Sequence, residues 1–312
     1  MASQRPIPFR HRVEFLAFRA VLAVLRALPE RWALAFGAGL GWVVGTVLRI
    51  RRDVTDANLA RAFPDRDRAW RDRVARASYA SVGREGVATF LFGGEPAERV
   101  IWRTPDPPGE REFMAAALSG RGMVAVTGHL GNWEMAGASA AARGAALDAV
   151  VVRQSNRLFD EAISQARANL GVRIVRKGDA PREALRSLAA GRVVALVADQ
   201  DARRAGIFVY LLGTPASTAR GPALFAIKAE VPLFIATCVP LPGQPGRYLA
   251  EAEEIHWERS DDLDEDVRRA TQAHVSALAA RVRRYPEHYF WQHRRWRTPP
   301  PAAPDPQNPS GV

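Results

Sequence analysis

The sequence predicts an α/β protein with a mixed, largely parallel sheet flanked by helices, preceded by an N-terminal membrane-associating helical segment. From about residue 119, short apolar, β-branched runs alternate with helical stretches, which is typical of parallel strands joined by helices. Residues 53–100 instead space their apolar side chains by three and four, as helices do. Residues 32–48 contain no charged side chain, and this run predicts the membrane-associating segment.

The composition excludes several classes of protein. The chain has 312 residues, of which 47% are hydrophobic and 25% charged, so it can build a large core and is not a disordered chain. Its single cysteine, Cys238, excludes an internal disulfide and a cysteine-based zinc site. The net charge of +11 predicts attraction to anionic partners such as anionic lipid, nucleic acid or an acidic carrier protein.

The N-terminal segment, residues 1–52, has the features of membrane-associating helices. As a helix, residues 32–48 would be about 26 Å long, which is borderline for crossing a bilayer. Gly37, Gly41 and Gly45 share one helical face, a spacing that lets helices approach closely. Residues 13–28 predict an amphipathic helix lying in the membrane interface. The alternative is a buried helical hairpin that packs on the rest of the protein.

The remainder divides into three parts. We predict a helical cap over residues 53–118, an α/β core over 119–298 and a disordered, proline-rich tail over 299–312. The cap and the core together form the predicted catalytic domain, 53–298. The strands of the core are expected at 123–127, 149–152, 172–175, 193–198 and 233–239.

One stretch of the core predicts chemistry. His129 follows the first strand, and glycines 128 and 131 allow a tight turn around it. Asn132 suits a helix N-cap, and Glu134 would fall in the first helical turn. A carboxylate beside an imidazole makes a general base for a hydroxyl, and the sequence has no nucleophile or metal motif that would require a covalent intermediate or a cofactor. The alternative is that His129 merely caps a turn and Glu134 a helix end.

The stretch from Thr127 to Glu134 resembles the His-x4-Asp/Glu motif of the lysophospholipid acyltransferase superfamily, in the form found in lipid A biosynthesis (lauroyl/myristoyl) acyltransferases. Four further stretches resemble that family in the same order, at residues 151–156, 197–201, 208–223 and 285–296. The resemblance spans residues 10–298. It implies a glycerolipid acyltransferase-like fold.

The resemblance also implies roles for individual residues. His129 would be the general base and Glu134 its orienting partner, with no metal and no cofactor. The residues expected to bind substrate are Gly131, Asn132, Arg153, Asn156, Asp199 and Arg220. Arg153 suits an anionic group, although a surface ion pair is the alternative. Asp199 is expected to hydrogen-bond within the site or to a sugar hydroxyl. If Asp199 and Asp201 both lay on a strand, they would point to opposite faces and could not share a metal.

The function that the resemblance implies is membrane-associated O-acyl transfer at the cytoplasmic face of the bacterial inner membrane. An acyl chain would move from acyl-acyl carrier protein to a hydroxyl of an anionic glycolipid, foremost a lipid A precursor. A mannosylated phosphatidylinositol as acceptor, with acyl-CoA as donor, stays open. A non-catalytic basic protein that binds lipid or nucleic acid is the alternative from another class; the family pattern predicts no nucleic-acid partner and a packed C-terminal element near the membrane surface.

Overall fold

The computed structural model describes residues 7–105, 107–169 and 171–301, so the predicted tail lies outside the described residues from position 302 onward. The elements before the sheet are helical. They are α1 (Phe9–Ala27), α2 (Glu30–Trp42), a π-helical turn (Val43–Val47), α3 (Arg52–Ala62), α4 (Arg68–Phe92), α5 (Ala97–Arg103) and α6 (Glu110–Leu118). The helices that follow are α7 (Trp133–Ala142), α8 (Arg157–Asn169), α9 (Ala180–Ala189), α10 (Gly221–Ala229) and α11 (Leu263–Arg284).

The main sheet has six strands in the order β3-β2-β4-β1-β7-β8. Its strands are β1 (Met123–Thr127), β2 (Leu147–Val151), β3 (Arg173–Arg176), β4 (Val193–Val197), β7 (Leu233–Pro240) and β8 (Tyr248–Glu254). All neighbours pair in parallel except β8, which runs antiparallel to β7. The predicted largely parallel α/β sheet is therefore confirmed.

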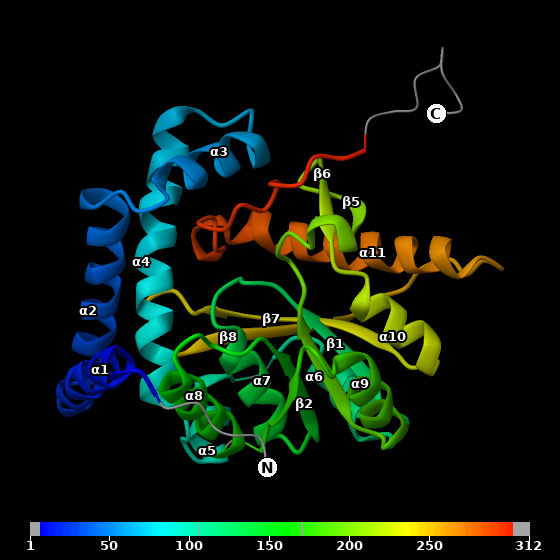
Figure 1. Cartoon of the computed structure of the whole chain (residues 1–312), viewed down its shortest axis with the longest axis horizontal. Helices are drawn as coiled ribbons and strands as arrows, with labels where there is room; N and C mark the ends of the chain where they lie inside the picture. The colour runs from blue at the N-terminus through cyan, green and yellow to red at the C-terminus, as the bar shows by residue number, and fades with distance from the viewer. Residues whose placement is uncertain (1–6, 106, 170, 302–312) are drawn as a thin grey trace.

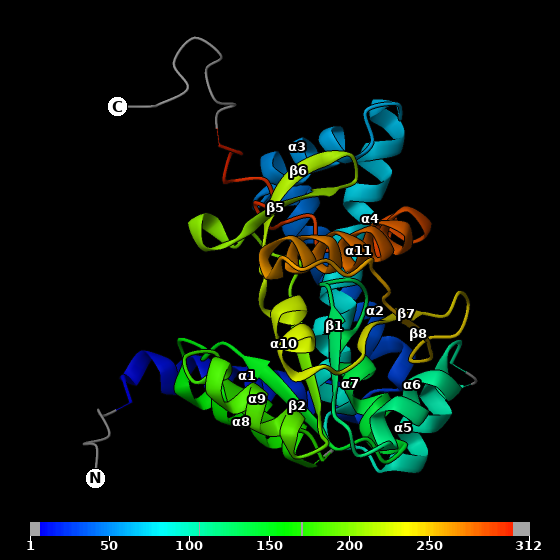
Figure 2. The ribbon, with the colours of Figure 1, turned by 90° about the vertical axis from the view of Figure 1, so that its right-hand side faces the viewer.

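Two features of the strand pattern were not predicted. One is β8, whose three glutamates hide its strand character in the sequence. The other is a separate antiparallel hairpin of β5 (Ile207–Leu211) and β6 (Thr214–Thr218), whose strands are not among those expected from the sequence. Helix α11 lies between this hairpin and the main sheet (Figures 1 and 2).

Alternation along the central strand builds a core on each face of the sheet. Val124 and Val126 of β1 belong to the larger cluster with buried residues of α9, α10 and α11. Met123 and Ala125 point the other way, into a cluster with residues of α6 and α7. Since successive side chains of a strand point to opposite faces, a strand covered on both sides must be apolar throughout. The continuous apolar run at 123–126 follows from this.

The glycine face of α2 packs against α4, beside which it stands in Figure 1. A Cβ atom at Gly41 would lie 2.0 Å from the Tyr79 carbonyl oxygen, and one at Gly37 would lie 2.7 Å from that of Gly83. The glycines therefore serve a close helix contact inside the protein, as the buried-hairpin alternative expected. The opposite side of α2 leaves Trp32 and Leu40 exposed.

No single helix in the described part of the chain is long and apolar enough to cross a bilayer. The segment Glu30–Val47 together with Arg52–Ala62 meets the length and composition test, but the two are bent by 90°. Membrane association of the N-terminal segment therefore stays a prediction.

Gly41→Ala should destabilise the protein, by about 1–3 kcal/mol, because the new methyl group collides with backbone that cannot move independently of α4. Gly39→Ala on the same helix is the matched control. A Cβ there meets no atom within 4 Å, so the substitution should leave stability unchanged or raise it. Thermal unfolding of both variants in detergent measures the difference; equal midpoints would contradict the close α2–α4 contact.

Candidate active site

The candidate site lies at the carboxyl edge of the parallel strands, where the loops after β1, β2, β3 and β4 meet. His129 follows β1, Arg153 follows β2, Lys177 follows β3 and Asp199 follows β4. Because β4 pairs directly with β1, the two loops that carry His129 and Asp199 are neighbours. In open α/β sheets this edge is where ligands bind.

Asp199 holds His129 by two hydrogen bonds. The Nδ1 atom of His129 lies 2.6 Å from Asp199 Oδ1, and the backbone N–H of His129 donates to Oδ2 over 2.8 Å. A carboxylate is an acceptor, so Nδ1 carries the proton and the lone pair of Nε2 is left to accept one. The Asp199 side chain is 3% exposed and that of His129 is 19% exposed, so the ring reaches solvent while its partner does not.

The prediction that Glu134 orients His129 is wrong, because the hydrogen-bonding partner of the ring is Asp199. Glu134 does lie in the first turn of α7, but its carboxylate receives two hydrogen bonds from the guanidinium of Arg167 on α8. Its charge still favours the His129 imidazolium at longer range. Glu134 lies on the side of α7 that faces α8. Asp199 reaches the His129 ring because β4 is the parallel neighbour of β1 in the sheet.

The electrostatics of the pair suit a general base. Burial disfavours the imidazolium, but the Asp199 carboxylate outweighs it and raises the pKa of His129 above its ordinary value of 6.5. Burial likewise opposes the charged form of Asp199, yet the facing His129 keeps the pKa of that carboxyl below its usual range. The base is therefore stronger than a free imidazole and its partner stays ionised.

The C-terminal segment, residues 285–296, completes the His129 loop. The N–H of Phe290 donates to the His129 carbonyl over 2.9 Å, and the N–H of Gly131 donates to the His288 carbonyl over 2.9 Å. Gly131 has φ +61°, and a Cβ atom there would lie 2.1 Å from the Cys238 carbonyl oxygen. The prediction of a packed C-terminal element is confirmed, because this segment also buries Trp291 and Arg295.

Asn132 and Gly131 support the loop and are not free to bind substrate. The Asn132 side chain caps α7 by accepting from the Met135 N–H, as predicted, and its amide donates to Glu85 over 3.1 Å. Glu85 on α4 also accepts from the Tyr248 hydroxyl, and burial raises the pKa of this carboxyl. The expected substrate-binding roles are corrected: Asn132 is 2% exposed, and the Gly131 N–H is already bonded.

Asn156 and Arg220 also have internal partners. The Asn156 amide donates to the His11 carbonyl and to Glu14, so it ties α1 to the start of α8. Arg220 pairs with Asp264 at 2.5 Å. The predicted substrate-binding role of Asn156, which is 7% exposed, is therefore replaced by a structural one. The Arg220–Asp264 pair is exposed to solvent, so substrate binding by Arg220 stays a prediction. Arg153 is exposed at the carboxyl edge, and its binding role stays a prediction.

Asp201 does not share a site with Asp199. Both residues follow the end of β4 and do not lie on it, contrary to the expectation of strand geometry. The Asp201 carboxylate accepts from the backbone N–H groups of Arg203 and Thr298 and from the Thr298 hydroxyl. Within residues 7–105, 107–169 and 171–301, no group of three or more His, Cys, Asp and Glu side chains could hold a metal ion.

A cavity of about 720 Å³ opens beside His129, and we call it the basic cavity. Its lining residues are Arg51, Lys177, Gln200, Asp201, Ala202, Arg203, His293, Arg294 and Arg297. Gln200 connects the cavity to the base, because its amide nitrogen lies 3.3 Å from Nε2 of His129. No sequence pattern marked these residues as a group, since they come from four separate parts of the chain.

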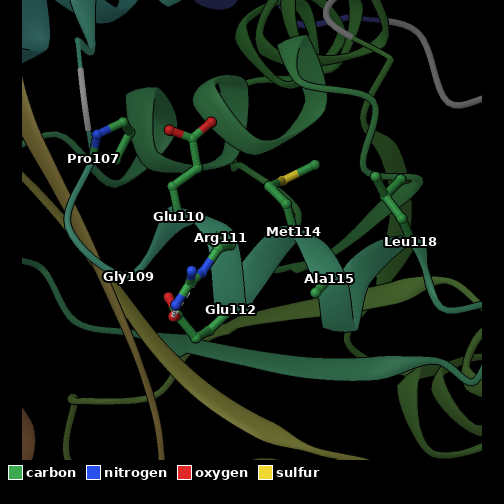
Figure 3. Close-up of a pocket in the computed structure, with 8 residues that line it drawn as sticks. All are labelled: Pro107, Gly109, Glu110, Arg111, Glu112, Met114, Ala115 and Leu118. Atoms are coloured by element: carbon green, nitrogen blue, oxygen red, sulfur yellow. Dashed lines mark hydrogen bonds and ion pairs between the residues drawn. The ribbon is translucent and has the colours of Figure 1, made fainter.

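A second hollow, of about 780 Å³, lies over α6 (Figure 3). Its charged side chains are already paired, Arg111 with Glu112 and Glu110 with Arg143. Helix α6 ends just before β1 begins, so this end of the helix lies at the amino end of that strand, away from His129. It is therefore not part of the candidate active site.

A carboxylate-paired histidine at the carboxyl edge of a parallel α/β sheet is suited to act as a general base. The family model for bacterial lipid A biosynthesis acyltransferases matches residues 3–298, and the chain belongs to this family. A phosphatidylinositol mannoside acyltransferase of Mycolicibacterium smegmatis is 27% identical over 93% of each chain. One from Mycobacterium tuberculosis is 28% identical over 71% of each chain. The protein is an acyltransferase.

Asp199→Asn should lower turnover by about 10²–10⁴-fold, more than Glu134→Gln, because Asp199 sets the tautomer of the base. A pH profile separates the two effects. In the parent, activity should rise with pH through a value above 6.5, since the neutral imidazole is the active form. Loss of the carboxylate removes the stabilisation of the imidazolium, so the rise should move to lower pH. An unshifted profile would contradict this assignment.

Proposed function

We propose that the protein transfers an acyl chain from a thioester donor to a hydroxyl group of an anionic glycolipid at a membrane surface. The observation that carries the proposal is the His129–Asp199 pair, which leaves Nε2 of His129 as a proton acceptor beside an open cavity. Membership of the acyltransferase family supports the reaction type. The donor is an acyl-acyl carrier protein or an acyl-CoA.

The proposed reaction needs one base and no acyl-enzyme. Nε2 of His129 takes the proton of the acceptor hydroxyl as its oxygen attacks the thioester carbonyl carbon. The resulting tetrahedral oxyanion collapses, the C–S bond breaks, and the imidazolium returns the proton to the departing thiolate. Arg153 is the cation we assign to the developing oxyanion, because it follows β2 at the same edge of the sheet. The products are an ester and a free thiol.

The acceptor that we propose is a mannosylated phosphatidylinositol. The support is that relatives aligned over most of the chain are named phosphatidylinositol mannoside acyltransferases. A lipid A precursor, the acceptor foremost in the sequence interpretation, is the competing candidate because it gives the matched family its name. Both are anionic glycolipids with acylatable hydroxyls, so a direct comparison decides between them.

The proposed membrane contact is the outer side of α1, α2 and the turn after them. Most of the large apolar side chains left exposed in the described part of the chain lie between residues 9 and 50. They include Phe9, Trp32, Phe36 and Leu40, with exposures of 81%, 58%, 49% and 53%. An apolar surface of this extent on a basic protein suits binding to an anionic membrane. We assign this surface to the cytoplasmic face of the bacterial inner membrane.

The reaction is tested by incubating detergent-solubilised protein with acyl-acyl carrier protein or acyl-CoA and each of the two acceptors. Mass spectrometry should show one added acyl chain on the mannosylated phosphatidylinositol. His129→Ala should lower this turnover by about 10²–10⁴-fold, because it removes the base. Acylation of the lipid A precursor alone would replace the proposed acceptor. Folded His129→Ala protein with normal turnover would refute the mechanism.

The membrane contact is tested by sedimentation with anionic phospholipid vesicles. Phe36→Ser/Leu40→Ser should weaken vesicle binding by about tenfold, because two apolar side chains no longer enter the interface. Leu118→Ser/Tyr210→Ser is the matched control, since both side chains are 61% exposed and lie outside this surface. Equal binding by the two double variants would refute the assigned surface.

A further inference from the structure

The basic cavity holds an excess of positive charge. Its five cationic side chains are those of Arg51, Lys177, Arg203, Arg294 and Arg297. None of the five forms an ion pair within the residues that the structure describes, and all five are exposed to solvent. The buried Arg103, in contrast, pairs with both Glu30 and Glu95.

Two other ionisable groups line the basic cavity, and one of them, Asp201, offsets a single positive charge. The Asp201 carboxylate is the single acidic group in the lining, and it accepts from Thr298 and from the Arg203 backbone. His293 accepts a hydrogen bond from the Asp201 N–H through Nε2 over 3.1 Å. Five like charges around one cavity repel one another, and a bound anion would relieve that repulsion.

The cavity is built by long-range folding. Lys177 follows β3, Arg203 follows β4 and Arg51 precedes α3. Arg294 belongs to the C-terminal segment, and Arg297 directly follows it. The parallel strands bring Lys177 and Arg203 to the same edge of the sheet. A volume of about 720 Å³ is in the range of small-molecule sites.

Gln200 links the basic cavity to the reacting atoms. Nε2 of His129 has its lone pair free because Nδ1–H faces Asp199, so the Gln200 amide donates to it over 3.3 Å. This contact is long and exposed, and an incoming hydroxyl would replace it. A ligand in the cavity therefore has its reactive end within reach of the base.

We propose that the basic cavity binds a phosphate group of a substrate and thereby positions the reacting end at His129. One guanidinium group can donate two parallel hydrogen bonds to the oxygens of a phosphate group, and four of the five cations are arginines. The inference rests on the proposed function, because both proposed substrates supply this chemistry. The phosphate belongs to the phosphopantetheine arm of the donor or to the phosphodiester of the acceptor.

The test is equilibrium binding to the full-length, detergent-solubilised protein. The probes are coenzyme A, glycerophosphoinositol and pantetheine, which lacks the phosphate. Arg294→Ala/Arg297→Ala removes two cavity cations. Arg121→Ala/Arg283→Ala removes two exposed arginines that form no ion pair among the described residues and do not line the cavity, so it is matched in charge.

The cavity variant should bind at least one phosphate probe ten times or more weakly than the parent, while the control variant stays within twofold. Binding by the parent should also weaken as salt rises. Loss confined to coenzyme A assigns the cavity to the donor, and loss confined to glycerophosphoinositol assigns it to the acceptor. Equal affinities in all three proteins, or no binding of either phosphate probe by the parent, would overturn the proposal.

Binding and catalysis are read separately, so the two proposals fail separately. A parent that binds a phosphate probe through the cavity but acylates neither acceptor refutes the proposed function alone. A parent that acylates an acceptor, with a cavity variant whose affinities and KM values equal those of the control, refutes the cavity alone. His129→Ala protein should retain the phosphate affinity of the parent, because the base is not part of the cavity lining.

Discussion

The candidate site depends on one buried carboxylate. Asp199 is almost fully removed from solvent, and a charge in that position is costly unless donors surround it. Two of its donors come from the same residue, the Nδ1–H and the backbone N–H of His129. The loop after β1 must therefore adopt its tight path for Asp199 to be stabilised. The Nδ1–H bond also sets the tautomer of the ring, and the backbone N–H bond ties the loop to the same carboxylate, so loop conformation and basicity are coupled.

The helical cap and the C-terminal segment act as structural parts of the site. Backbone groups in a buried turn need partners, and residues 288–290 supply them to the His129 loop in a strand-like pairing. That segment is itself held by α3 and α4, where Asn58 donates to the Trp291 carbonyl and Ser78 to the Tyr289 carbonyl. The end of β1 positions His129, and the C-terminal segment, far away in sequence, holds the His129 loop in place.

Arginine serves two opposite purposes in this basic protein. Some buried or interhelical arginines are compensated by carboxylates, as Arg167 is by Glu134, whereas the buried Arg295 donates to the Ser217 carbonyl and the Thr218 hydroxyl. At the basic cavity the positive charges are in excess next to the reacting nitrogen. Some of the arginines that give the net charge of +11 therefore form internal contacts, while those of the basic cavity create a local positive potential that attracts anions.

The sequence by itself determined the parallel strands of the sheet and the position of the candidate base, His129. Continuous apolar strands, the glycines around His129 and the N-cap at Asn132 act through local backbone geometry, so their outcome can be predicted from neighbouring residues. Tertiary structure decided the partners. Strand order makes Asp199, seventy residues away, the partner of His129, while Glu134, Asn156 and Arg220 meet side chains on other elements. Strand pairing joins residues without regard to their separation along the chain. The order of the strands in the sheet is therefore not visible in any local pattern of a single sequence.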